Sequence, residues 1–287
     1  MYTMRPAEFE YHRPGSLDEA LALLGDESRP LAGGHSLLPL MKMRLSTPAA
    51  LVDLADVPGL DEISEDGDGL RVGALATHAA VAASELVRSR CPVLAETAAL
   101  IGDAQVRNRG TLGGSVAHAD PAADYPTVLT ALGATIAVAG ENGEREIAAG
   151  DFFTGMFATA LQPGELVVAA KVSATGAGTG AAYVKHRHPA SFYAVVGVAA
   201  VVTVENGSCT NARLMIGGVT GEPVDAAAAA EAVGAPPSEE SAAAAADRVA
   251  DVLPNAMSDT YASDEYRTHL AGVLAKRALE LAFERAA

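Results

Sequence analysis

Cysteine is scarce in this sequence. Only Cys91 and Cys209 occur, far apart in the chain and outside any CxxC pair. Two such residues give no disulfide framework. An iron–sulfur cluster needs about four thiolates, so this chain cannot hold a cluster alone. Any cluster that works with this protein must therefore be carried by another chain.

Positive charge is also in short supply. The chain has 20 basic and 36 acidic residues, a net charge of −16, and only four lysines. A field of this sign repels nucleic acid and anionic membranes, so we expect no nucleic-acid partner. An anionic ligand must instead be held by local donors that act against the overall field.

Long apolar runs are missing as well. No segment is long and apolar enough to span a bilayer, so we expect no transmembrane segment. The stretch from Met1 to Pro6 is not followed by the apolar region of a secretory signal. The expected location is therefore the cytoplasm.

The composition that is present is that of a globular α+β protein. The chain has 287 residues, of which 49% are hydrophobic and 20% charged, and this length can form two or three compact units. Pro58-Gly59 marks one boundary, and the small, glycine-rich segment 173–180 marks another. The predicted units are residues 1–57, 58–175 and 178–287.

Local patterns predict several elements inside these units. Ser16 and Glu19 form the ends of a capping box, and Asn142-Gly143 and Asn206-Gly207 are typical of hairpin turns. The residues 194–204 form an apolar, β-branched run that is typical of a buried strand. Ser263 is placed to cap a last helix. On that helix we expect one apolar face formed by Tyr266, Leu270, Val273, Leu274 and Leu281.

Two glycine-rich turns are the most informative motifs. The first, Ala32-Gly33-Gly34-His35-Ser36, lies between a predicted strand and a predicted helix, and the second is Thr111-Leu112-Gly113-Gly114-Ser115. Glycine lets the backbone adopt positive φ and approach a ligand closely. Successive amides in such a turn form an anion-binding nest, to which a following helix adds its positive end. Each turn is therefore a candidate phosphate site.

The two turns do not match the best-known nucleotide fingerprints. Neither is a G-x-G-x-x-G sequence or a Walker A loop, which argues against a Rossmann site and a P-loop nucleotidase. Either Gly-Gly pair alone is explained as well by an ordinary tight turn. Two nests on two subdomains suit two adjacent phosphates, as in the pyrophosphate of a dinucleotide. The spacing does not name the ligand.

Other polar patterns give no catalytic or metal site. His186 and His188 could form half of a metal site, but no cysteine or acidic cluster accompanies them, so solvated or cofactor-edge histidines are favoured. For His118, Asp120 and Asp124, the favoured interpretation is a loop in which Asp120-Pro121 ends one segment and caps the next helix, with Asp124 reaching ribose or ribityl hydroxyls. Cys91 and Cys209 are interpreted as structural residues.

Two longer strings resemble a known family. Residues 32–44, AGGHSLLPLMKMR, and residues 107–126, RNRGTLGGSVAHADPAADYP, are similar to the FAD-binding medium subunits of carbon monoxide dehydrogenase and related molybdenum hydroxylases, within the xanthine dehydrogenase family. The resemblance covers the whole chain. It implies a two-subdomain, PCMH-type FAD-binding module, followed by a small domain with a three-stranded antiparallel sheet and helices.

The resemblance also implies cofactor contacts at particular residues. In the family, the two turns bind the FAD pyrophosphate and its neighbourhood, an acidic and a basic position contact the cofactor, an apolar residue lies near the flavin, and a tyrosine packs on the isoalloxazine ring. The corresponding residues here are Ala32, Gly33, Gly34, His35 and Ser36; Thr111, Leu112, Gly113, Gly114 and Ser115; and Asp124, Lys185, Ile101 and Tyr193.

The function implied by the resemblance is electron transfer through FAD. A small [2Fe-2S] subunit and a large molybdenum-cofactor subunit are the implied partners, in a dimer of heterotrimers, that is a heterohexamer. Electrons then leave FAD to NAD or a quinone, with peripheral contact to a quinone-linked acceptor. Carbon monoxide is the expected substrate of the parent enzyme; an aldehyde, a purine or an N-heterocycle is the alternative.

Two rival functions stay open at this point. A self-standing flavin oxidase needs a substrate pocket with its own acid–base residues, and no such constellation is visible in the C-terminal unit. A binding or assembly module that has lost FAD is the other rival. The intact glycine pairs of both turns speak against it.

Overall fold

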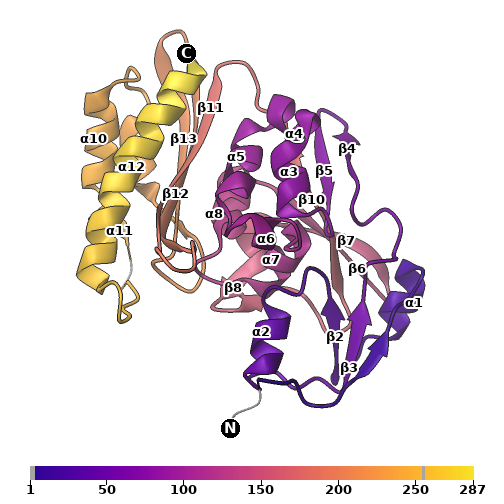
Figure 1. Ribbon diagram of the computed structural model, residues 1–287. Coiled ribbons are helices and arrows are strands. Elements are labelled where there is room, and N and C mark those ends of the chain that lie inside the picture. The colour runs from indigo at the N-terminus through magenta and orange to yellow at the C-terminus, as the bar shows by residue number, and fades with distance from the viewer. Residues whose placement is uncertain (1–3, 254–255) are drawn as a thin grey trace.

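The computed structural model describes residues 4–253 and 256–287. Three β-sheets follow one another along the chain, together with a two-stranded ribbon of β8 (Phe153–Gly155) and β9 (Ala158–Thr159) (Figure 1). Helices cover the second and third sheets. The α+β class is confirmed.

The first sheet is small and parallel. It contains β1 (Glu10–His12), β2 (Ser28–Leu31) and β3 (Ala50–Asp53) in the order β1-β3-β2. The connecting helices are α1 (Leu17–Ala22) and α2 (Leu37–Lys42). At α1 the predicted cap is confirmed, because the Ser16 side chain accepts the Glu19 amide. The Glu19 carboxylate reaches back to the amide of Gly15, one residue further than expected.

The second sheet is antiparallel and has the order β4-β5-β10-β6-β7. Its strands are β4 (Ile63–Asp66), β5 (Gly69–Gly73), β6 (Thr135–Gly140), β7 (Gly143–Ala148) and β10 (Leu166–Ser173). The Asn142-Gly143 hairpin is confirmed between β6 and β7. Six helices enter between β5 and β6, and a short one follows β7: α3 (His78–Ala83), α4 (Glu85–Arg90), α5 (Pro92–Leu100), α6 (Ala104–Arg107), α7 (Leu112–His118), α8 (Asp124–Ala131) and α9 (Ala149–Phe152).

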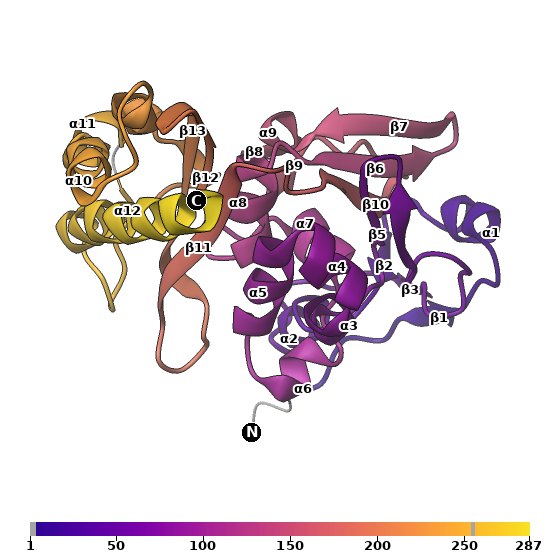
Figure 2. The same cartoon turned by 90° about the horizontal axis from the view of Figure 1, so that it is seen from above.

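The third sheet forms the C-terminal part. Three long antiparallel strands, β11 (Thr179–Arg187), β12 (Ala194–Glu205) and β13 (Ser208–Gly217), match the three-stranded expectation, and the two-residue β14 (Val224–Asp225) adds a short fourth. Figure 2 shows α10 and α12 on one face of this sheet and α8 on the other. The helical elements after the sheet are η1 (Ala227–Ala232), α10 (Glu239–Asp247), α11 (Val249–Val252) and α12 (Asp264–Ala286).

The predicted face of the last helix is only partly right. Ser263 does cap α12, Leu274 is buried, and Leu270 and Leu281 pack against the core, but Tyr266 is 43% exposed. The buried face also contains Arg267, Leu279 and Phe283, with alanines between them. The reason is close packing: a Cβ atom on Gly180 of β11 would lie 1.9 Å from the carbonyl oxygen of Ala282. Only small side chains fit at such an approach, so alanines and not large apolar residues define the contact.

The apolar cores cross the expected unit boundaries. The largest core cluster lies around the second sheet and its helices, and it includes Tyr183, Ala199 and Met215 of the third sheet. A smaller cluster joins Val52 and Leu54 to Val168 of β10. The glycine-rich linker is shorter than expected, because Thr179 and Gly180 already belong to β11. The division at 57, 175 and 178 stays a prediction.

Candidate cofactor-binding site

A cavity of about 380 Å³ lies where the three parts of the chain meet. Its wall is formed by residues 29–40 around α2, by 74–78 and 101–124 around α3, α6 and α7, and by 191–193 of the C-terminal part, with Leu54, Leu166 and Val167 at its base. This volume lies within the range of small-molecule sites in proteins. Of the fourteen residues predicted from the sequence, twelve line the cavity; Leu112 and Lys185 do not.

The first glycine turn connects β2 to α2 and has free donors. Gly34 adopts φ +75°, a conformation that favours glycine. Among the described residues, no protein oxygen accepts the backbone amides of Gly33, Gly34 or His35. The side chain of Ser36 also makes no capping hydrogen bond at the start of α2. These groups are available to an anionic ligand.

Gly33 is required for a different reason than ligand approach. A Cβ atom at this position would lie 2.1 Å from the carbonyl oxygen of Arg109 and 2.8 Å from the Cα atom of Gly110. The first turn therefore packs directly against the segment that precedes the second one. Gly33 and Arg109 are 76 positions apart in the sequence. The two motifs nevertheless form one wall of the cavity.

The second motif is not a turn but the start of a helix. Thr111 is the N-cap residue of α7, and its side chain accepts the amide of Gly114. The amides of Leu112 and Gly113 donate to the carbonyl groups of Ala76 and Ala74. The expectation of a second nest of free amides is therefore wrong. Capping by Thr111 and pairing with the end of β5 satisfy these donors within the protein.

The glycines of the second motif serve packing and access. A Cβ atom on Gly113 would lie 2.4 Å from the Cβ of Ala74, so α7 lies tightly against the residues after β5. Leu112 is buried in the core. A Cβ atom on Gly114 would lie 3.6 Å from Ala32 of the first turn. Gly114 and Ser115 line the cavity, where α7 presents its positive end.

Asp124 and Lys185 form a buried ion pair behind the cavity. The Lys185 Nζ atom lies 2.8 Å from Oδ1 of Asp124, and the Tyr183 hydroxyl donates to the same oxygen at 2.7 Å. Burial raises the pKa of Asp124, and the ammonium group of Lys185 opposes this shift. Lys185 also donates to the carbonyl of Phe192 at 2.9 Å. Lys185 does not line the cavity, but it binds Asp124 and the Phe192 carbonyl group, and both of these residues line it.

The loop between β11 and β12 places an aromatic side chain at the cavity. His188 Nδ1 accepts the amides of Ala190 and Ser191, and Phe192 adopts φ +61°, which is strained for a non-glycine residue. The guanidinium of Arg187 lies 4.9 Å from the centre of the Phe192 ring. This local structure directs Tyr193 to the cavity wall, where burial raises its pKa.

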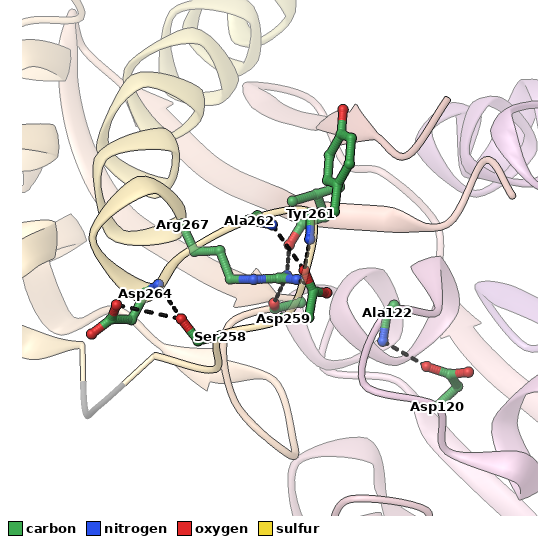
Figure 3. Close-up of polar contacts among 10 residues, drawn as sticks. Asp120, Ala122, Ser258, Asp259, Tyr261, Ala262, Asp264 and Arg267 are labelled. Atoms are coloured by element: carbon green, nitrogen blue, oxygen red, sulfur yellow. Dashed lines mark hydrogen bonds and ion pairs between the residues drawn. The ribbon is translucent and has the colours of Figure 1, made fainter. Parts of the chain in front are cut away.

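A second loop ties the cavity wall to the C-terminal sheet (Figure 3). Asp120 accepts the amide of Ala122 at 2.9 Å within the loop. The expectation that it caps the next helix is wrong, because Ala123 is the N-cap residue of α8 and no side chain caps that helix. The Pro121 carbonyl accepts the amide of Gly218. Figure 3 shows the side chain of Arg267 extending from α12 to Asp259, and Arg267 also donates to the carbonyl of Gly218 at 2.7 Å. The position of Asp120 thus depends on α12.

The remaining histidines and the cysteines behave as structural residues. His186 and His188 contact the rings of Tyr266 and Tyr261. In the described part of the chain, no group of three potential ligands could hold a metal ion. Cys91 and Cys209 are free and buried, and burial raises the pKa of Cys91 to about 11. No described helix has the length and apolar character that crossing a membrane requires.

Several lining residues were not predicted as cofactor contacts. They come from positions beside the motifs or from other elements: Arg29, Leu37, His78, Gly110, His118, Asp120 and Phe192. Among them, His78 is only 4% exposed and carries a polar atom without a partner. His78 lines the cavity because α3 packs against Gly110, and no local sequence pattern predicts that packing.

The site fits a nucleotide cofactor with an aromatic ring. It combines free amides for phosphate groups, a positive helix end, a mainly apolar cavity and a tyrosine on its wall. The fold and this site are therefore those expected of a protein that binds a dinucleotide cofactor.

Comparison with known proteins identifies the family. The family described as "FAD binding domain in molybdopterin dehydrogenase" matches residues 7–173, and the "CO dehydrogenase flavoprotein C-terminal domain" matches residues 181–282. The carbon monoxide dehydrogenase medium chain of Afipia carboxidovorans is 39% identical over 286 residues, covering 99% of both chains.

Solved structures agree with this result. A chain of the carbon monoxide dehydrogenase from Hydrogenophaga pseudoflava has a TM-score of 0.94 and 40% identity, with 98% of this chain and 99% of that chain covered. A chain of quinoline 2-oxidoreductase from Pseudomonas putida 86 has a TM-score of 0.93 and 35% identity, with the same coverage. The chain belongs to the family of FAD-binding subunits of molybdenum hydroxylases, and it is an oxidoreductase component whose cofactor is FAD.

Proposed function

We propose that this chain is the FAD-bearing electron-transfer subunit of an aerobic carbon monoxide dehydrogenase. The observation that carries the assignment is the wall formed by the first glycine turn and the start of α7, with free donors on one side and a positive helix end on the other. Carbon monoxide as the substrate rests on the similarity to the carbon monoxide dehydrogenase chains over nearly the full length.

The proposed roles of the site residues follow from their positions. The amides of residues 33–35 and the Ser36 hydroxyl bind the pyrophosphate, and Ser115 approaches it from the other side. Asp124 binds hydroxyl groups of the ribityl or ribose chain, because an ionised carboxylate accepts hydrogen bonds. Ile101 and Tyr193 pack near the isoalloxazine ring. Leu112 and Lys185 support these residues from behind the cavity wall.

When bound, FAD supplies the redox chemistry, because it exchanges electrons singly with clusters and releases two to an acceptor. The protein positions the ring, keeps water away from one of its faces and leaves a path for electrons. Among the described residues that line the cavity, no hydrogen bond joins a serine or threonine hydroxyl to a histidine. In this proposal, substrate oxidation therefore takes place on a partner subunit.

The proposed partners are a small [2Fe-2S] subunit and a large molybdenum-cofactor subunit, assembled as a dimer of heterotrimers. Both cysteines are buried, so clusters must come from another chain. The α2 region offers a docking face: Met43 is 52% and Leu45 72% exposed, and within the described residues Lys42 and Arg44 form no ion pair. Apolar side chains beside unpaired cations suit a protein partner with an acidic rim.

The cytoplasmic location and the quinone-linked acceptor stay predictions. The alternative function is that of a medium subunit of a hydroxylase acting on an aldehyde, a purine or an N-heterocycle. The quinoline 2-oxidoreductase chain gives the N-heterocycle its support, since its TM-score of 0.93 is close to that of the carbon monoxide dehydrogenase chain. A self-standing oxidase is disfavoured, since no such hydroxyl–histidine pair is found among the described residues of the cavity wall.

Two measurements test the proposal. Titration of the full-length chain with FAD should give one bound flavin per chain, and a chain that binds none contradicts the flavin assignment. The chain should then be purified with its associated subunits and exposed anaerobically to carbon monoxide, an aldehyde, a purine or quinoline. Bleaching of the flavin absorbance by carbon monoxide alone supports the proposed substrate. Bleaching by another substrate, or by any substrate in the isolated chain, selects the corresponding alternative.

A further inference from the structure

Two buried polar atoms next to the cavity have no hydrogen-bond partner. They are Nδ1 of His78 and the hydroxyl oxygen of Tyr125. The two rings face each other with their centres 5.4 Å apart. A buried polar group without a partner is unfavourable, and such groups gather where a ligand or a buried water completes the structure. The side chains of His78 and Tyr125 therefore form one incomplete polar cluster, and the cavity touches it at His78.

The backbone around His78 fixes the orientation of its ring. Thr77 caps α3, and the His78 amide donates to the Gly110 carbonyl at 2.9 Å. A Cβ atom on Gly110 would lie 2.6 Å from Nε2 of His78, so the Nε2 edge of the ring lies against the backbone that precedes Thr111. A side chain 4% exposed, held on both sides, has little freedom to turn.

Charge and burial define the protonation state of the ring. Burial lowers the pKa of His78 to about 4, with further lowering from His35 and Arg107 nearby. At neutral pH the imidazole is uncharged, so one nitrogen donates a hydrogen bond and the other accepts one. Burial and the neighbouring Asp124 raise the pKa of Tyr125, which therefore keeps its proton. A tyrosine hydroxyl and an imidazole are complementary in this state.

We propose that His78 is a cofactor-binding residue whose Nε2–H donates to an acceptor atom of the bound flavin nucleotide, and that the Tyr125 hydroxyl donates to Nδ1 through one water. This rests on the proposed function, namely that FAD occupies the cavity. Tyr125 acts through His78 and is a positioning residue: its hydrogen bond selects the tautomer that carries the proton on Nε2. With the cofactor bound, Nε2 of His78 has an acceptor in the flavin nucleotide and Nδ1 has a donor in Tyr125, through the water.

The proposal predicts an unusual separation of stability from affinity. Replacing His78 by Phe removes an unsatisfied buried atom from the free protein, so the thermal midpoint without FAD should stay equal or rise. The same change removes a donor to the cofactor, so the dissociation constant for FAD should increase about tenfold. A histidine with only a packing role would lose stability and leave the dissociation constant unchanged.

The experiment uses the full-length chain and measures the FAD dissociation constant, the visible flavin spectrum and the thermal midpoint without FAD. The variants are His78→Phe, Tyr125→Phe, the double variant, and His78→Gln, whose amide can donate from nearly the same place as Nε2. The matched control is His269→Phe, at an exposed position of α12. The double variant should bind FAD as weakly as His78→Phe and no more weakly, because the two residues act in series.

Each outcome decides the question. His78→Gln should stay within about threefold of the parent chain, with an unchanged flavin spectrum. An FAD dissociation constant of His78→Phe within twofold of the parent overturns the proposal, and so does full additivity in the double variant. If His78→Phe does not fold, failure of the Gln variant to retain FAD while folding normally has the same meaning. If the parent chain itself binds no FAD, the proposed function has failed instead.

Discussion

The carboxylate of Asp124 and the ammonium group of Lys185 lie 2.8 Å apart, although one belongs to α8 in the cavity wall and the other to β11 of the C-terminal sheet. Both side chains are almost completely buried, and the Tyr183 hydroxyl completes the carboxylate's hydrogen bonds. This pair connects the C-terminal part to the cofactor site. Its removal on one side leaves an uncompensated charge in the interior.

We predict that Lys185→Met destabilises the chain by about 3–5 kcal/mol, because it leaves Asp124 buried without its cation. Denaturant unfolding monitored by circular dichroism measures this change. The control is Lys171→Met, whose ammonium pairs with Asp66 and Glu146 at the surface and should cost about 1 kcal/mol or less. Equal losses of unfolding free energy in the two variants would show that the buried Asp124–Lys185 pair contributes no more to stability than a surface ion pair.

We predict that Gly33→Ala lowers FAD affinity at least about tenfold and destabilises the chain by about 1–3 kcal/mol. The new Cβ atom would lie 2.1 Å from the Arg109 carbonyl oxygen, so the first turn must move away from the segment before α7. Fluorescence titration with FAD reports the affinity. Gly150→Ala is the control, since a Cβ atom there meets nothing within 4 Å. An unchanged dissociation constant for Gly33→Ala argues that the wall is not part of the FAD site.

We predict an acid-dependent loss of stability at His78. Its pKa lies near 4 in the folded chain and near 6.5 in the unfolded chain. Between these values the unfolded state binds a proton that the folded state does not. The free energy of unfolding therefore rises with pH across this window. Acidification through the window lowers it by up to about 3 kcal/mol.

The measurement compares the parent chain with His78→Phe by urea unfolding between about pH 4 and about pH 8. The difference between the two should change across the window and become constant above about pH 7.5. His269→Phe serves as the exposed control and should follow the parent profile. Parallel profiles for parent and His78→Phe would show that His78 titrates alike in both states.

We predict that Leu45→Asp prevents assembly with the partner subunits while the isolated chain keeps its fold. Leu45 is 72% exposed and follows α2, so the change costs the folded chain little. In an apolar interface, however, the new carboxylate is desolvated, and it also repels the acidic rim proposed for the partner. Size-exclusion chromatography of the co-expressed subunits measures assembly. Val233→Asp, at an exposed position of the C-terminal part, should assemble normally; loss of assembly in both variants, or in neither, contradicts the docking face.

Local patterns were sufficient for several of the elements. The Asn-Gly turns, the caps at Ser16 and Ser263, and the apolar run of β12 depend on neighbouring residues only, and the structure has all of them. Twelve of fourteen predicted site residues line the cavity. The similarity of two strings to a known family provided the cofactor, which spacing alone did not.

Contacts between distant segments account for what the sequence did not predict. The glycine pair at 113–114 had the pattern of a second nest, but the carbonyl groups of Ala76 and Ala74 accept the amides of Leu112 and Gly113. The apolar face of α12 had a helical period, but the approach of Gly180 to Ala282 selected alanines in its place. No sequence motif indicated His78, because its position at the cavity depends on contacts with Gly110 and Tyr125.

The sequence by itself determined the class of fold, and it predicted an anion site at the first glycine turn and a dependence on another chain for iron–sulfur clusters. Those properties follow from backbone freedom at glycine, from local donors and from the count of thiols. Only the tertiary structure decided which amides stay free, which glycines are needed for packing, and that Lys185 lies behind Asp124. The physical reason is that hydrogen-bond satisfaction and close packing are settled between segments far apart in the chain.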